Sequence, residues 1–282
     1  MGTERVTLHV EEAGPPDGPL VVLLHGFPEF WQAWHRQLEE FGRDCRAVAL
    51  DLRGYNLSAK PRGARHYALP AIVADVRAVL RALSPQTPAV LVGHDWGGLA
   101  AWTLARESPE LLERLVIINA PHPPLFQREL KHSGAQRLAS SYAAFFQLRG
   151  VAELALRAFG YAALRKMIFG LTRKPEQFPP ALRDAYRVAW SQPYALTAGL
   201  SYYRNPRALK RLVESPASWR IEVPTLVLWG DRDRALLQGN LVGLEELVPR
   251  LTVQHHARAT HWIVHEEPAW VNNSIRSFLC GG

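Results

Sequence analysis

A chain of 282 residues has room for one large domain with an insertion or for two smaller domains. Hydrophobic residues make up 48% of it and charged residues 21%, which is ordinary for a globular protein, and the formal net charge is +7. The two cysteines are too few for a disulfide framework, so we expect two unpaired thiols. The amino-terminal segment lacks an apolar core of signal-peptide length, and no run approaches the roughly 20 apolar residues of a membrane span. We therefore expect a soluble cytoplasmic protein.

Strand-like and helix-like runs alternate from Thr7 to about Asn119. The expected strands are apolar on both faces and cover residues 21–24, 47–50, 90–92 and 115–118. The expected helices cover residues 69–83 and 99–107. Strands that are apolar on both faces are typical of a parallel sheet covered by helices on both sides. The sequence therefore predicts an α/β fold.

Three prolines, Pro121, Pro123 and Pro124, then interrupt this pattern. From about Leu125 to about Val213 the pattern is helical and contains no strand signal. The sheet pattern resumes over residues 223–229 and 251–255, and a final helix is expected near 270–279. We therefore predict a core domain formed by residues 1–122 and 214–282, with an all-helical cap inserted at 123–213.

The positive charge is concentrated in the predicted cap. Residues 123–213 contain 15 lysines and arginines against 4 acidic residues, a net charge of +11, whereas the rest of the chain has a net charge of −4. One interpretation is a solvated helical surface. The other is weak attraction of an anionic substrate or an anionic membrane surface. Nucleic acid is not an expected partner, because no nucleic-acid reading module is present.

The segment Gly93-His94-Asp95-Trp96-Gly97 lies between a predicted strand and a predicted helix. It has the pattern of a nucleophile elbow, in which small glycines allow a sharp turn that pushes the central side chain into a cleft. Serine is the usual central residue, and here it is Asp95. A carboxylate has a reference pKa of about 3.9, so it can attack without a base. This suits displacement at a saturated carbon of an epoxide or alkyl halide, through an alkyl-enzyme ester.

Hydrolysis of such an ester needs a base, an acid that orients the base, and donors for an oxyanion. The predicted strand at 224–230 ends in Asp231-Arg232-Asp233, and His261 follows, which gives the order nucleophile, acid, histidine. We take Asp233 as the acid and keep Asp231 as an alternative. The strand at 21–24 leads into His25-Gly26-Phe27-Pro28, so the backbone amides of Phe27 and Trp96 are candidate oxyanion donors.

From about Leu20 to about Leu279 the chain resembles the epoxide hydrolases of the α/β-hydrolase superfamily. The motifs that carry the resemblance are residues 25–31 (HGFPEFW), residues 51–55 (DLRGY), the aspartate elbow, residues 230–233 (GDRD) and the neighbourhood of His261. The resemblance implies an α/β-hydrolase fold. It also implies Asp95 as the nucleophile, His261 as the base and Asp233 as the orienting acid.

Two cap segments, 141–147 and 200–205, are similar to the family segments that carry ring-opening tyrosines. The resemblance implies Tyr142 for the first. For the second it implies Tyr203 rather than Tyr202, because Tyr203 directly precedes Arg-Asn. Phenols with a reference pKa of about 10 can hydrogen-bond the oxygen of an opening epoxide, and one of them can donate a proton.

The remaining expectations concern the pocket and the loops. Phe27, Pro28, Trp31 and Trp96 are expected to line the substrate pocket, and His25 to brace its loop. The family usually has glycine where Asn56 stands, and asparagine tolerates positive φ, so we expect that turn to survive. No glycine-rich phosphate loop follows the first strand and no histidine cluster has metal-ligand spacing, so neither a cofactor nor a metal is expected.

The leading hypothesis is an enzyme that converts a lipophilic epoxide and water to a vicinal diol, with a role in detoxification, as a monomer or homodimer. The second hypothesis is a dehalogenase. Haloalkane dehalogenases typically have asparagine at the position of Phe27 and fluoroacetate dehalogenases have arginine at that of Trp96, so both departures favour the epoxide. The third hypothesis is a non-catalytic small-ligand receptor on the same fold, against which the intact set of candidate catalytic residues argues.

Overall fold

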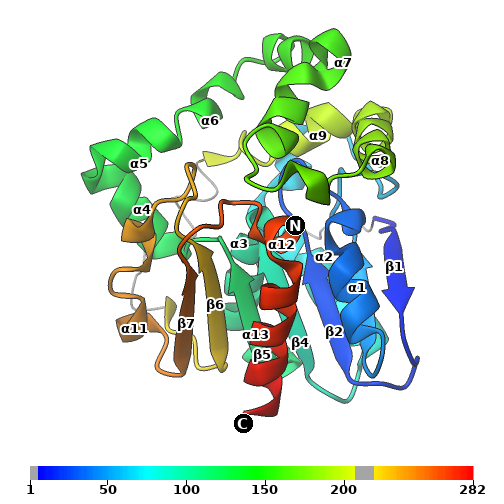
Figure 1. The fold of residues 1–282 in the computed structure, drawn as a ribbon, viewed down its shortest axis with the longest axis vertical. Helices are drawn as coiled ribbons and strands as arrows, with labels where there is room; N and C mark the ends of the chain where they lie inside the picture. The colour runs from blue at the N-terminus through cyan, green and yellow to red at the C-terminus, as the bar shows by residue number, and fades with distance from the viewer. Residues whose placement is uncertain (1–5, 207–218, 282) are drawn as a thin grey trace.

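A seven-stranded sheet forms the centre of the computed structural model, which describes residues 6–206 and 219–281 (Figure 1). The strand order is β1-β3-β2-β4-β5-β6-β7, with β1 antiparallel to β3 and the other neighbours parallel. The strands are β1 (Val10–Ala13), β2 (Leu20–Leu24), β3 (Arg46–Leu50), β4 (Ala89–His94), β5 (Leu112–Ile118), β6 (Thr225–Gly230) and β7 (Leu251–His256). The predicted α/β fold with a mostly parallel sheet is confirmed.

Helices bury both faces of the sheet. Alternate residues of each strand point to opposite faces, so Val22 and Leu24 of β2 belong to one hydrophobic cluster and Val21 and Leu23 to the other. The first cluster includes α2 (Leu69–Leu83) and α3 (Trp96–Glu107), and the second includes α1 (His35–Phe41) and α13 (Pro268–Cys280). This double burial explains why the central strands, such as β2, are apolar on both faces, whereas the edge strands β1 and β7 carry polar residues.

The strand order creates a crevice between β2 and β4. The chain leaves β2 toward β3 on one side, and it leaves β4 toward β5 on the other side. Ligands of open α/β sheets bind at such a switch point, outside the carboxyl ends of the strands. Phe27 follows β2 and Asp95 follows β4, so the topology brings these two residues together.

The turn at Asp95 depends on close backbone approaches. Asp95 has φ 51° and ψ −119°, an uncommon conformation for a residue other than glycine. A Cβ on Gly97 would lie 2.3 Å from the carbonyl oxygen of Leu24, and a Cβ on Gly26 would lie 2.3 Å from Asp95. Helix α3 begins at Trp96, whereas the sequence pattern suggested Leu99. The two glycines after Trp96 have low helix propensity, so the sequence pattern did not indicate the first turn of this helix.

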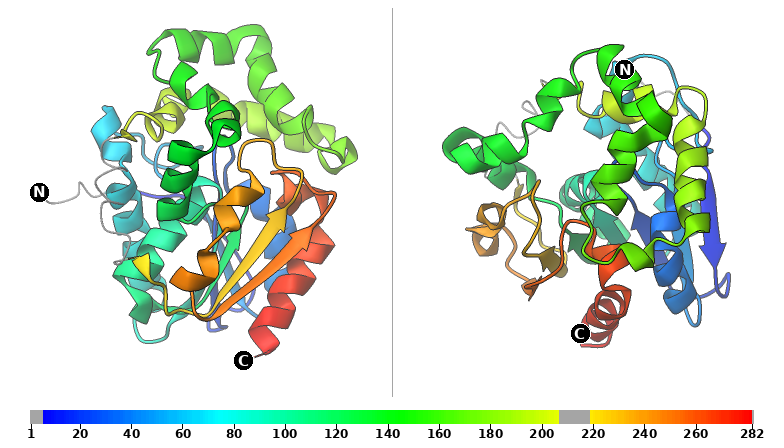
Figure 2. Two further views of the ribbon diagram at one scale, coloured as in Figure 1. Left: turned by 90° about the vertical axis from the view of Figure 1, so that its left-hand side faces the viewer. Right: turned by 45° about the horizontal axis from the view of Figure 1, so that its top comes forward.

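Between β5 and β6 the described residues form helices and loops and no strand. These helices lie over the carboxyl ends of the strands (Figures 1 and 2). They include α4 (Pro123–His132), α5 (Gly134–Ala139), α6 (Tyr142–Phe145), α7 (Val151–Phe169), α8 (Pro180–Ser191) and α9 (Ala195–Ser201). Helix α4 begins at the residue where we placed the start of the cap. The other expected boundary, between residues 213 and 214, lies outside the described residues.

Two local predictions are confirmed. Asn56 has φ 38°, and its side-chain amide donates a hydrogen bond to Asp51 Oδ2 at 2.8 Å, so asparagine supports the turn after β3. Cys45 is buried and Cys280 is exposed, and both are free thiols.

Candidate active site

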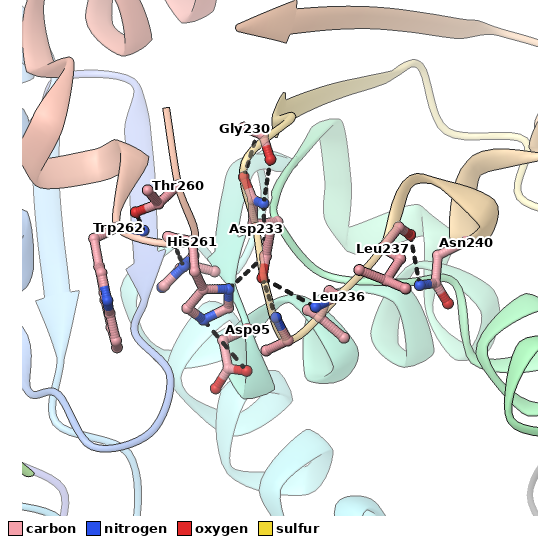
Figure 3. A network of polar contacts seen from close by, with 12 residues as sticks. Asp95, Gly230, Asp233, Leu236, Leu237, Asn240, Thr260, His261 and Trp262 are labelled. Atoms are coloured by element: carbon pink, nitrogen blue, oxygen red, sulfur yellow. Dashed lines mark hydrogen bonds and ion pairs between the residues drawn. The ribbon is translucent and has the colours of Figure 1, made fainter. Parts of the chain in front are cut away.

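Three side chains from loops after different strands meet at the carboxyl edge of the sheet (Figure 3). His261 Nδ1 donates a hydrogen bond to Asp233 Oδ2 at 2.7 Å. His261 Nε2 lies 3.8 Å from Asp95 Oδ2. The imidazole therefore lies between two carboxylates, with one nitrogen facing each.

Asp233 is fixed by backbone and side-chain donors. Its Oδ1 accepts hydrogen bonds from the amides of Ala235 and Leu236 at 2.8 and 2.9 Å, and its Oδ2 accepts one from Asn119 Nδ2 at 2.8 Å. Burial alone would raise the pKa of Asp233, but His261 and the two amides lower it below the usual range. Sequence reasoning missed Asn119, whose signal is a polar side chain directly after the buried strand β5.

The alternative acid, Asp231, faces a different histidine. Its Oδ1 lies 2.8 Å from His255 Nδ1, and this pair is partly exposed. The structure therefore places Asp233, and not Asp231, beside His261.

His261 has an unusual pKa. Burial by itself would lower the pKa, but the charges of Asp233 and Asp95 and the hydrogen bond to Asp233 raise it to about 9. In the resting protein at neutral pH the imidazole is therefore protonated, and its charge is balanced by the flanking carboxylates.

The loop after β2 supplies a donor to the carboxylate of Asp95. The backbone amide of Phe27 donates a hydrogen bond to Asp95 Oδ1 at 2.8 Å. Trp96 is the first residue of α3, and the first amides of a helix have no partner within the helix. Buried His25 braces this loop, because its Nε2 accepts a hydrogen bond from the amide of Leu52 at 3.1 Å.

Two mostly apolar cavities meet at Asp95. Cavity A has a volume of about 260 Å³, and its walls include Met167, Leu171 and Trp262. Cavity B has a volume of about 220 Å³, and its walls include Leu69, Leu99 and Phe126. Both cavities are also lined by Asp95, Tyr142 and Tyr203. A ligand on Asp95 can therefore extend in two directions while it touches the same two phenols.

The rings of Tyr142 and Tyr203 pack edge to face, with centroids 5.9 Å apart. The ring of Tyr203 also packs against Phe27 and Trp96, at 5.4 and 5.2 Å. Burial raises the pKa of both tyrosines above the ordinary value, so both phenols stay protonated at neutral pH.

Tyr202 has a different environment from its neighbour. Its hydroxyl donates a hydrogen bond to the carbonyl of Arg53 at 2.8 Å, and it lines only cavity B. Arg53 is itself buried and paired with Asp75. Tyr202 thus fixes α9 to the turn after β3, whereas Tyr203 faces both cavities.

The predicted pocket residues lie in different places. Phe27 lines cavity A and Trp96 lines cavity B. Pro28 lines a separate cavity of about 20 Å³, and its carbonyl accepts a hydrogen bond from Trp190 Nε1 at 2.6 Å. Trp31 lies outside all three, which corrects the prediction that it lines the substrate pocket. It opens a 3-10 helix whose start is fixed by a hydrogen bond from its amide to Asp51 Oδ1 at 2.8 Å, and its ring packs against Phe30.

A buried carboxylate behind the site was missed by sequence reasoning. Glu29 Oε1 accepts a hydrogen bond from the hydroxyl of Tyr186 at 2.8 Å and lies 2.7 Å from His265 Nε2, and Glu29 Oε2 lies 3.3 Å from His94 Nδ1. Burial alone would raise the pKa of Glu29, but the two histidines hold it well below the usual range. His94 Nε2 lies 2.9 Å from the carbonyl oxygen of His261. The signal for Glu29 is an acidic residue within an otherwise apolar loop.

A second buried carboxylate connects the cap to the loop that carries His261. Glu266 accepts hydrogen bonds from the amide and hydroxyl of Thr260 at 2.7 and 2.9 Å. It also accepts bonds from the hydroxyl of Thr172 at 2.8 Å and the amide of Arg173 at 2.7 Å, both between α7 and α8. Movement of this part of the cap would therefore disturb the loop beside His261.

Within residues 6–206 and 219–281, no group of three or more histidine, cysteine or acidic side chains could hold a metal ion.

Comparison with known proteins shows the family of the chain. A family model for the alpha/beta hydrolase fold matches residues 19–268. The chain is 41% identical to AB hydrolase superfamily protein YfhM of Bacillus subtilis, over 99% of this chain and 96% of that protein. It is 36% identical to epoxide hydrolase 4 of Mus musculus, over 96% of this chain and 76% of that protein. The solved structure of Bacillus megaterium epoxide hydrolase in complex with an inhibitor superposes with a TM-score of 0.90, at 36% identity and 99% coverage of both chains. The chain belongs to the epoxide hydrolases of the α/β-hydrolase superfamily.

The pKa of His261 tests which acid orients it. In Asp233→Asn the buried imidazole loses its nearest negative charge while its burial stays, so the pKa should fall by at least about one unit from the value near 9. Asp231→Asn removes the alternative candidate acid and should leave the pKa of His261 unchanged. Titration of the His261 ring by NMR measures both, and an unchanged pKa in Asp233→Asn would contradict the assignment.

The raised pKa of His261 beside Asp233 also determines how the stability of the protein changes with pH. The folded-state pKa of His261 lies above the ordinary value of 6.5, so protonation favours the folded protein. This contribution to the free energy of unfolding is fully present below about pH 6.5 and is lost as the pH rises through about 9.

Proposed function

We propose that the protein hydrolyses lipophilic epoxides to vicinal diols through an ester on Asp95. One observation carries the proposal: the carboxylate at the elbow and two protonated phenols line the same pair of cavities. A carboxylate suits attack on a strained ring carbon, and phenols suit the alkoxide that leaves it. The apolar walls favour a substrate with hydrophobic substituents.

Ring opening forms one bond and breaks another. Asp95 Oδ2 attacks an oxirane carbon while Oδ1, held by the amide of Phe27, becomes the carbonyl oxygen of the ester. The carbon–oxygen bond of the ring breaks, and the released alkoxide takes a proton from Tyr142 or Tyr203. The imidazolium of His261 returns a proton to the phenolate through water, so the ester state has neutral histidine and neutral phenols.

Ester hydrolysis restores the resting state. Formation of the ester removes the charge of Asp95, one of the charges that raise the pKa of His261, so the pKa falls and the neutral imidazole is easier to form. It takes a proton from water as the hydroxide adds to the ester carbonyl. The amides of Phe27 and Trp96 stabilise the oxyanion. The intermediate then collapses to the carboxylate of Asp95 and the diol, and His261 is again protonated.

The two tyrosines separate this proposal from halide release. A halide leaves as a stable anion and needs hydrogen-bond donors but no proton, so a dehalogenase has no use for two protonated phenols. A receptor would bind its ligand unchanged, and it would not need His261 to be held between two carboxylates. The proposal therefore favours the epoxide over both alternatives.

Parallel assays of diol and bromide formation test the proposed function. Tyr203→Phe should reduce kcat for an aryl epoxide by about a hundredfold, because ring opening loses a hydrogen-bond and proton donor. Tyr202→Phe is the matched control, and it should retain most of kcat because that hydroxyl is bonded to Arg53. Bromide release from a bromoalkane without diol formation would move the protein to the dehalogenases, and recovery of unchanged epoxide would favour the receptor.

Two arginines at the mouth of cavity A should favour substrates that carry a negative charge. Arg232 and Arg234 line this cavity and are exposed, and among the described residues neither has an ion-pair partner. We expect an epoxide with a terminal carboxylate to have a higher kcat/KM than its methyl ester, by about threefold at low salt. Arg234→Gln should reduce this ratio, and Arg250→Gln, at the other end of the sheet, should not. Equal values for acid and ester in the wild-type protein would contradict the preference.

A further inference from the structure

Helix α7 contains an abrupt kink that turns one aromatic side chain inward and another outward. Phe159, Gly160 and Tyr161 have φ values of 52°, 64° and 63°, in the left-handed region. A bulky residue in this region is a genuine outlier, so tertiary contacts are needed to hold it. The ring of Tyr161 supplies one, because it is buried against Trp190 at 5.8 Å. Phe159 is 91% exposed.

Phe159 is one of several exposed apolar side chains on this part of the chain. Leu148, Val151 and Leu154 come before it in the chain and are 52%, 56% and 74% exposed. Single exposed apolar side chains need no explanation, but exposed apolar side chains that gather in one region point to an interaction site. We call residues 148–166 the cap ridge. Helix α7, which forms most of it, lies at the end of the molecule opposite the carboxyl terminus (Figure 1).

The cap ridge is also positively charged. Arg149, Arg157, Arg165 and Lys166 are exposed, and none of them has an ion-pair partner among the described residues. The one acidic residue of the ridge, Glu153, is paired with Arg204 at 2.7 Å and accepts a hydrogen bond from the amide of Gly150. The surface therefore combines apolar side chains with cationic ones and has no unpaired carboxylate.

This combination fits an anionic lipid surface better than a second copy of the chain. Two copies that met through the cap ridge would place like charges opposite one another. A bilayer that contains anionic lipids offers negative headgroups for the basic side chains and an apolar layer for exposed rings and aliphatic chains. No described helix is long and apolar enough to cross a membrane. We propose that the cap ridge binds the surface of anionic membranes, with Phe159 inserted at the headgroup level.

The position of the cap ridge connects membrane binding to cavity A. Helix α7 continues from the ridge to Met167, which lines cavity A, and exposed Leu171 follows at the same cavity. A lipophilic ligand that has partitioned into a bilayer would then lie near the cavity mouth. The binding itself requires no reaction, so its test is independent of the proposed function.

Sedimentation of the protein with vesicles tests the proposal. The bound fraction should be higher on mixed phosphatidylcholine and phosphatidylserine vesicles than on phosphatidylcholine alone, and it should fall as salt is added. Phe159→Ser should weaken binding to the mixed vesicles by at least about threefold, because an apolar anchor is lost. Val242→Ser, which also replaces an exposed apolar side chain but lies on the core, is the matched control and should bind like the wild-type protein.

Three outcomes would overturn the proposal. The first is equal binding to both kinds of vesicle. The second is wild-type binding by Phe159→Ser. The third is concentration-dependent self-association in size-exclusion chromatography that Phe159→Ser abolishes, which would make the ridge an interface between copies of this chain.

Discussion

The hydrogen bond from the amide of Phe27 to the carboxylate of Asp95 is the contact on which the rest of the site depends. It exists because the chain leaves β2 and β4 in opposite directions, so the loops after these strands meet. The approach is so close that Gly26 and Gly97 have no room for a side chain. The same contact leaves the other oxygen of Asp95 directed at His261, and it fixes the point where the two cavities join.

Charge balance around His261 connects this geometry to the proposed reaction with two steps. With Asp95 ionised, the imidazole lies between two carboxylates and its pKa is raised to about 9. In the proposed ester one of these charges is absent, so the pKa of His261 falls and its neutral form, which can accept a proton, is easier to form. This change would need no movement of the imidazole.

The sequence was sufficient for the fold and for the residues that lie directly after strands. Asp95, Asp233 and Phe27 each follow an apolar run, so their place at one sheet edge could be derived from periodicity. Asn119 also follows a strand directly, so its place at this edge could be derived, but its bond to Asp233, 114 residues away, could not. The role of Glu29 could not be derived, because its partner His265 is 236 residues away in the chain. The orientation of Trp31 could not be derived either, because it depends on the hydrogen bond to Asp51 and on the 3-10 helix that begins at Trp31. The kink at Phe159 has no sequence signal beyond Gly160.

The most direct test of the account is the mass of the protein after it has been mixed with an aryl epoxide in a His261→Gln variant. Without the base the ester should accumulate, so the protein should gain the mass of one epoxide, and peptide mapping should place the added mass on Asp95. Replacement of Asp95 by Asn in the same background should abolish the gain. Absence of an adduct in the His261→Gln variant, or an adduct on another residue, would contradict the ester mechanism.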